Sequence, residues 1–210
     1  MGQNYLFEIS FLPSIYFFSV FSQKEITLEQ MENYQKRSFR NKCVIASANG
    51  PLLLTIPLKK GKHEGQKIRE VKIAYDEDWQ KLHLSTIQTA YRNAPYYDFY
   101  IDKLHSLYQH ADEYLFNFNL LLIRKIAPLL SLSTFNFTNE YVECCQGIDL
   151  RGVITPRNYH QIRMPKYNQV FEDRLGFLSN LTILDLLFCL GPESINYLKS
   201  VDLTEALKAI

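Results

Sequence analysis

The hydrophobic period of the sequence changes near residue 76. From Trp79 to Tyr91, apolar residues recur at the i, i+3, i+4 and i+7 spacing of one helix face. Asp76 is a suitable N-cap, and the pattern ends at "NAPYY" because the residue before a proline avoids helical angles. The segments before residue 76 are instead short apolar runs separated by turn residues, which is typical of strands. We therefore expect a mixed α/β fold.

The N-terminal third is predicted to be mainly strands. The candidate strands are 5–11, 43–46, 52–57 and 68–73. Asn49-Gly50 is a strong hairpin signal, because both residues tolerate positive φ. We expect these strands to share one mixed sheet. The 77–92 helix should pack on that sheet through four side chains of its apolar face: Trp79, Leu82, Ile87 and Ala90.

The rest of the chain is predicted to be mainly helical. The candidate helices are 15–21, 77–92, 96–109, a segment after residue 112, 180–190 and 193–199. Thr134–Thr138 alternates and should return the chain to the sheet, whereas 144–171 has no clean period. A long irregular stretch in a compact domain is either functional or disordered. We expect residues 1–210 to form a single domain, with strands in 1–75, helices in 76–130, and a strand, a long loop and C-terminal helices in 131–210.

Composition and charge exclude several classes of protein. The net charge of +1 argues against a sequence-independent nucleic-acid binder, although aromatic residues interleaved with the cations keep an RNA-binding module as a minor alternative. The four cysteines form no CxxC pair with histidines at zinc spacing, so we predict reduced thiols and no metal site. The apolar segment Leu6–Phe21 is interrupted by polar residues and Pro13, so we predict no transmembrane segment and a cytoplasmic location.

Two basic stretches contain no acidic residue. The first holds seven cations: Lys36, Arg37, Arg40, Lys42, Lys59, Lys60 and Lys62. The second holds four: Arg151, Arg157, Arg163 and Lys166. Arginine forms forked hydrogen bonds to phosphate or carboxylate, so these stretches could bind an anion, with Arg40 and Arg151 close together. The alternative is two solvated loops.

Two ionisable residues lie on apolar helix faces. His83 could act as a general base or fill the core with one hydrogen bond. Asp185 lies among leucines, and a buried carboxylate is costly without a partner, so it should meet Arg151, Arg174 or a backbone amide. The GxGxxG, GxxxxGKS, GxSxG and HExxH signatures are absent, and no cofactor is indicated.

Five segments in chain order resemble the WbqC-like family of bacterial proteins. They are "KRSFRNK" (36–42), "NGPLLLTIPLKKG" (49–61), "IREVKI" (68–73), "WQKLHLSTIQTAYRNAPYYDFY" (79–100) and "YNQVFEDRLGFLSNLTILDLLFCLGPESINYL" (167–198). The resemblance implies a role in the synthesis of O-antigen or another surface polysaccharide, where some members are suggested to transfer glycine onto sugars.

The resemblance also implies a set of polar site residues. They are Lys36, Arg37, Arg40, Asn41, His83, Gln169, Asn180 and Asp185. The chain departs from the family where many members have paired aspartates, because Gln30 and Met31 stand there, flanked by Glu29 and Glu32.

Two functions are consistent with these features. The first is a transferase for an aminoacyl or acyl group, in which His83 and Asp185 are catalytic. The substrate of this transferase would be a phosphorylated small molecule or nucleotide-sugar. The residues expected to bind it are Lys36, Arg37, Arg40, Asn41, Arg151, Gln169 and Asn180. The second is a non-catalytic binding or scaffolding protein of the same pathway. The oligomeric state is not predicted.

Overall fold

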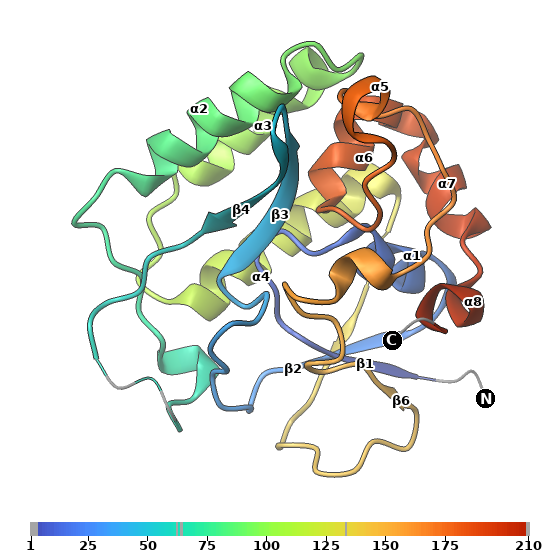
Figure 1. The fold of residues 1–210 in the computed structure, drawn as a ribbon. Coiled ribbons are helices and arrows are strands. Elements are labelled where there is room, and N and C mark those ends of the chain that lie inside the picture. The colour runs from blue at the N-terminus through green and yellow to red at the C-terminus, as the bar shows by residue number, and fades with distance from the viewer. Residues whose placement is uncertain (1–3, 62, 64, 133, 209–210) are drawn as a thin grey trace.

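Four short parallel strands form the central sheet of the protein (Figure 1). The structure, a computed structural model, describes residues 4–61, 63, 65–132 and 134–208, so Lys62 of the first basic stretch lies outside it. Within the described residues, the strand order of this sheet is β5-β2-β1-β6. The strands are β1 (Tyr5–Glu8), β2 (Ile26–Glu29), β5 (Asn136–Phe137) and β6 (Ile148–Asp149).

A buried helix connects the two central strands. α1 (Ile15–Gln23) crosses from β1 to the parallel β2, and parallel neighbours require such a crossover. Its sequence, IYFFSVFSQ, is apolar on nearly every side, and its residues 15–21 are all buried. Ser14 caps the helix, since its hydroxyl accepts a hydrogen bond from the Phe17 amide at 3.5 Å. The sequence predicted this helix but not β2.

The predicted hairpin is confirmed, but it forms a second sheet of its own. β3 (Lys42–Ser47) and β4 (Gly50–Thr55) pair in antiparallel fashion, with Ala48 and Asn49 in the turn and Gly50 at a φ of +113°. The expectation of one shared sheet was wrong, because β2 and β6 occupy both edges of β1. The predicted strand 68–73 is also wrong: it begins as a 3-10 helix, Ile68–Glu70, and makes only isolated bridges.

The three middle helices match the predicted ones within a few residues. They are α2 (Trp79–Tyr91), α3 (Tyr97–Tyr108) and α4 (Leu115–Ile126), followed by a 3-10 turn at Ala127–Leu130. The N-cap of α2 is Asp78 rather than Asp76, because the Asp78 carboxylate accepts from the Lys81 amide. The predicted packing face is correct except for Leu82, which is 65% exposed.

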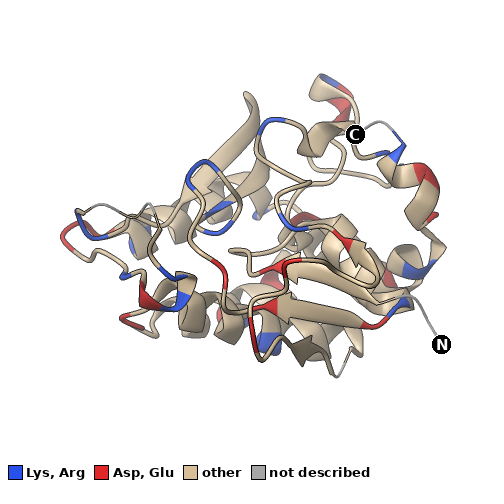
Figure 2. Ribbon diagram, turned by 90° about the horizontal axis from the view of Figure 1, so that it is seen from below, with Lys and Arg blue, Asp and Glu red and all other residues tan. Residues whose placement is uncertain are grey.

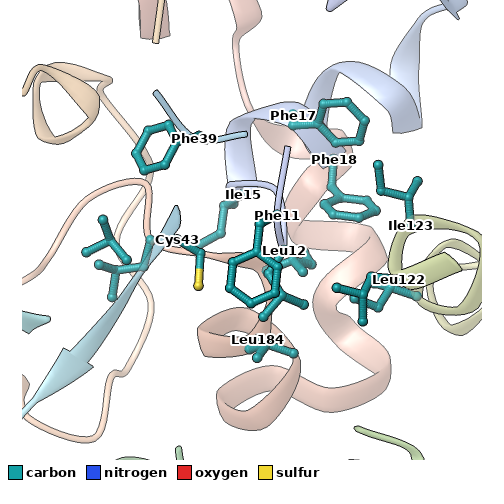
Figure 3. Close-up of a cluster of buried hydrophobic side chains, with 14 of the residues drawn as sticks. Phe11, Leu12, Ile15, Phe17, Phe18, Phe39, Cys43, Leu122, Ile123 and Leu184 are labelled. Carbon is teal, nitrogen blue, oxygen red and sulfur yellow. The ribbon is translucent and has the colours of Figure 1, made fainter. Parts of the chain in front are cut away.

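The C-terminal part is helical and packs against α1 through α6, α7 and α8. Its helices are α5 (Glu172–Leu175), α6 (Ile183–Leu190), α7 (Ser194–Ser200) and α8 (Leu203–Leu207), with 3-10 turns at Tyr159–Gln161 and Gly191–Glu193. α6 begins three residues later than predicted and follows Thr182 as its N-cap. Figure 3 shows the core where α1, α4 and α6 meet: side chains of Ile15 and Phe18 gather with those of Leu122, Ile123 and Leu184. The mixed α/β fold class is thus confirmed.

None of the helices in the described ranges has the length and apolar character needed to cross a membrane.

Candidate functional site

Three carboxylates stand at the ends of neighbouring strands. Glu8, Glu29 and Asp149 are the last residues of β1, β2 and β6, and Glu8 and Glu29 are register partners. Because the strands are parallel, these residues lie at one edge of the sheet, the carboxyl edge. Ligands of open α/β sheets bind outside this edge, so the strand-end carboxylates are the first residues of a candidate site.

Arg151 links two of these carboxylates. Its Nη1 donates to Glu29 Oε2 at 3.1 Å, and its Nε and Nη2 donate to Asp149 at 3.0 and 2.6 Å. Its Nη2 also donates to the Val142 carbonyl at 2.7 Å. Glu29 is fully buried, and Thr138 Oγ1 donates to its Oε1 at 2.7 Å. The hydrogen bonds from Arg151 hold the pKa of Asp149 below its ordinary value.

A second, more deeply buried ion pair lies beside the first. Arg40 is fully buried, and its guanidinium donates from Nε to Glu32 Oε1 at 2.8 Å and from Nη2 to Oε2. Burial raises the pKa of Glu32, and the hydrogen bonds from Arg40 oppose that rise. Burial also raises the pKa of Glu8, which accepts from the Gly152 amide at 2.9 Å and lies within the field of Arg40. Arg40 and Arg151 therefore belong to one strand-end network.

A polar cleft of about 400 Å³ opens on this network. It is lined by Glu32, Asn33, Gln35, Lys67, Tyr141, Asp149 and Arg151. Tyr141 is 52% exposed, and the Arg151 guanidinium carbon lies 5.2 Å from its ring centroid. The cleft thus combines an exposed aromatic face with carboxylates in two different environments. One carboxylate, Glu32, has a raised pKa and the other, Asp149, has a lowered pKa, a combination that suits acid–base chemistry.

Two exposed cations of the first basic stretch directly follow a cleft residue in the sequence. Lys36 and Arg37 are exposed and directly follow Gln35, which lines the cleft. Arg40 points inward instead and is neutralised by Glu32. In Figure 2 the basic segments are interspersed with acidic ones. Arg40 and Arg151 thus bind different acids, Arg40 binding Glu32 and Arg151 binding Glu29 and Asp149. Their predicted joint anion site stays a prediction.

Asn41 and Asn180 are buried amides engaged with the chain itself. Asn41 accepts from the Tyr34 hydroxyl at 3.1 Å and donates to the Ile56 carbonyl at 2.9 Å. Asn180 has a φ of +52° and accepts from the Tyr16 amide at 2.9 Å. Both contacts fix the backbone, and their predicted role in substrate binding stays a prediction.

Asp185 and Gln169 come together in a separate buried cluster. Tyr91 donates to Asp185 Oδ2 at 2.8 Å, and Gln169 Nε2 and the Tyr167 hydroxyl donate to Oδ1. Burial raises the pKa of Asp185. The expected partners Arg151 and Arg174 were wrong, because tyrosine hydroxyls and an amide satisfy this carboxylate. The cluster joins α2 to α6 through side chains that lie outside the strand-end cleft.

His83 lies in an aromatic part of the core. It is 4% exposed, its ring centroid is 5.1 Å from that of Trp79, and its Nδ1 is 3.4 Å from the Tyr108 hydroxyl. Burial lowers its pKa to about 4, so the ring is neutral near pH 7. His83 is not among the residues that line the strand-end cleft, and its catalytic role stays a prediction.

Sequence reasoning did not select the strand-end carboxylates as site residues. Glu8 is the end of β1, but the predicted strand continued to residue 11, and β2, which ends at Glu29, was not predicted. Asp149 falls in the stretch without a clean period. The one available signal was the position of Glu29 and Glu32 on either side of Gln30 and Met31, where many family members have paired aspartates. The fold places these two glutamates close enough for the charge of Glu29 to raise the pKa of Glu32.

Comparison with known proteins gives one family. The WbqC-like protein family model matches residues 10–154, which include all the residues lining the cleft. The chain is also 27% identical over 199 residues to the uncharacterised protein Rv1507c of Mycobacterium tuberculosis, with 79% of this chain and 84% of that protein covered. No solved structure matches. The family match spans well over half of the sequence, and the chain belongs to the WbqC-like protein family.

Proposed function

We propose that the protein is a transferase that moves an acyl or aminoacyl group onto a sugar in bacterial surface-polysaccharide synthesis. The observation that carries this proposal is the strand-end cleft, in which Glu32 and Asp149 have pKa values shifted in opposite directions. Family membership and the position of the cleft within residues 10–154 support it.

The acceptor sugar is assigned to the cleft itself. Its ring would stack on the exposed face of Tyr141, because sugars present apolar C–H faces that pack on aromatic rings. Asp149, kept ionised by Arg151, would accept hydrogen bonds from the sugar hydroxyls. Asn33 and Gln35 supply further polar groups at the wall. A cleft of about 400 Å³ is within the usual range for a small-molecule site.

Glu32 is assigned as the general base. In the transfer, the acceptor oxygen or nitrogen bonds to the acyl carbon, the bond to the leaving group breaks, and the leaving group departs with the electron pair. The acceptor proton passes to Glu32, whose burial raises its basicity. Lys36 and Arg37, exposed beside the cleft in the chain, would attract a phosphorylated donor.

The experiment is a calorimetric titration of the protein with uridine-diphosphate sugars and the matching free sugars. We expect one sugar to bind. Asp149→Asn should weaken its binding about tenfold or more, as loss of a hydrogen bond to a charged group does. Tyr141→Ala should also weaken binding, because the stacking surface is lost. Asp98→Asn, an exposed change on α3, is the control and should leave affinity unchanged. Equal affinities in Asp149→Asn and Asp98→Asn would remove the support for this site.

A non-catalytic sugar-binding protein is the second candidate. It is favoured by one observation: both oxygens of Glu32 already accept from Arg40. Mass spectrometry of a bound sugar incubated with acyl donors separates the two functions. Catalysis is supported if the unmodified protein transfers the acyl group and Glu32→Gln does not, while both bind the sugar with the same affinity. Sugar binding by the unmodified protein without any transfer supports the alternative.

A further inference from the structure

An apolar groove is lined by residues of α3, α4 and α6 and lies apart from the strand-end cleft. Its volume is about 290 Å³, and it shares no lining residue with the cleft. Its floor is made of buried side chains of Leu104, Ile126, Leu184, Leu187 and Phe188. These side chains give the groove an apolar floor.

Two lysines stand at the edge of this groove. Lys103 on α3 and Lys125 on α4 both line it and are exposed. The Lys103 ammonium lies 5.2 Å from the ring centroid of Tyr100, another lining residue, and 4.3 Å from that of Phe99. Among the described residues, neither ammonium has a carboxylate within 4.0 Å, and no lining residue is acidic. The groove is therefore apolar inside and positively charged at its edge.

We propose that this groove binds a single-chain anionic amphiphile, a fatty acid or a molecule of the same chemistry. The hydrocarbon floor accepts an alkyl chain, and the uncompensated ammonium groups attract the carboxylate. The volume is at the small end of ligand pockets, about 300–1,000 Å³, which suits one chain rather than two. This site is independent of the proposed transferase function.

The test is a calorimetric titration with alkyl carboxylates of eight, ten and twelve carbons, below their micelle concentrations. Each added methylene should tighten binding about fourfold until the groove is filled. Alkyl trimethylammonium ions and alkyl glucosides of the same chain lengths should bind at least tenfold more weakly than the carboxylates. Equal affinity for the cationic amphiphile would overturn the proposal, as would an affinity independent of chain length.

Two variants examine the two parts of the site. Ser106→Trp adds a large side chain at an exposed lining position on α3. It should weaken the binding of the alkyl carboxylates at least tenfold. The double variant Lys103→Glu with Lys125→Glu should abolish the preference for the anion and leave the glucoside affinity unchanged. The control is Lys199→Glu, an exposed lysine on α7 that does not line the groove.

Circular dichroism establishes that each variant is folded before binding is compared. Unchanged carboxylate affinity in folded Ser106→Trp overturns the proposal. So does a dimer of the unmodified protein that Ser106→Trp dissociates, because a second copy of the chain would then be the occupant.

Discussion

At the scale of single residues, the protein buries charges that hold one another in place. Arg40 is fully buried beside Glu32, and Arg151 reaches the fully buried Glu29. Removing a charge from water costs several kcal/mol unless its partner is close and its hydrogen bonds are satisfied. The pairing of Arg40 Nε and Nη2 with Glu32 offsets part of this cost, whereas Arg40 Nη1 has no hydrogen-bond partner among the described residues. The pairing also places carboxylates with opposed pKa shifts in one cleft.

His83 should make the protein less stable in mild acid. The pKa of His83 is about 4 in the folded protein, whereas its ordinary value, expected in the unfolded chain, is 6.5. Between these two pH values the unfolded chain therefore binds more protons than the folded one. The free energy of unfolding therefore falls as pH drops from 6.5 toward 4, and one such histidine accounts for about 2 kcal/mol between pH 7 and pH 5. Urea unfolding of the protein and of His83→Gln at both pH values measures this difference.

The comparison with His83→Gln isolates the histidine, because every other ionisable group is the same in both proteins. Glu8, Glu32 and Asp185 have raised pKa values, which act in the opposite direction, but they are present in both proteins. His105→Gln makes the same substitution at an exposed histidine on α3 and is the matched control. If His83→Gln loses as much stability on acidification as the unmodified protein, the buried-imidazole account is incorrect.

At the scale of elements, the site depends on a very short strand. β6 has only Ile148 and Asp149, but it brings Asp149 and Arg151 to the carboxyl edge. It is held by the Ile148 amide, which donates to Asn4 O at 3.0 Å, and by the Leu150 amide, which donates to Leu6 O at 2.8 Å. Such close pairing leaves no space for a side chain at Gly147, where a Cβ would collide with the Asn4 carbonyl oxygen.

Gly147→Ala should detach β6 from β1. We expect a loss of at least about 1 kcal/mol in the free energy of unfolding, within the range for a backbone clash, and a loss of sugar binding in the cleft. Amide hydrogen exchange at Ile148 and Leu150 should become faster. Gln146→Ala, at the exposed preceding residue, is the matched control. Retained protection at both amides in Gly147→Ala would contradict this account of β6.

At the scale of the whole molecule, the C-terminal third completes the core of the N-terminal part. Asn180 accepts from the Tyr16 amide of α1, and Thr182 donates to the Leu12 carbonyl at 2.7 Å. Gln23, at the end of α1, donates to the carbonyls of Leu198 and Val201 at 3.0 and 2.9 Å. These contacts join segments more than 160 residues apart in the chain. They support the expectation of a single domain.

A single domain should unfold in one transition. Fluorescence of Trp79, the only tryptophan of the sequence, and far-ultraviolet circular dichroism should give the same urea midpoint. A fragment of residues 1–158 should remain unfolded, because α1 would lose its cover of α6, α7 and α8. Two separate transitions, or a fragment that unfolds cooperatively, would show that the C-terminal part is a separate unit.

Local patterns were enough to predict much of the fold. The spacing of apolar residues from Trp79 to Tyr91 predicts α2, and Asn49-Gly50 predicts the hairpin, because both signals arise within one element. The assignment of strands to sheets could not be predicted, since pairing joins residues far apart in sequence, such as Leu6 and Asp149. β2 is too short, at four residues, to show a clear alternation.

The site divides in the same way. Arg40 and Arg151 could be selected from charge alone, because an acid-free basic stretch is visible in the sequence. Their partners could not, because burial and distance decide whether an arginine meets solvent or a carboxylate. Glu32 is only eight residues from Arg40, yet its carboxylate receives that guanidinium because the chain folds back on itself. Parallel pairing of β1, β2 and β6 then brings Glu8, Glu29 and Asp149 to one edge, and only the tertiary structure determines that convergence.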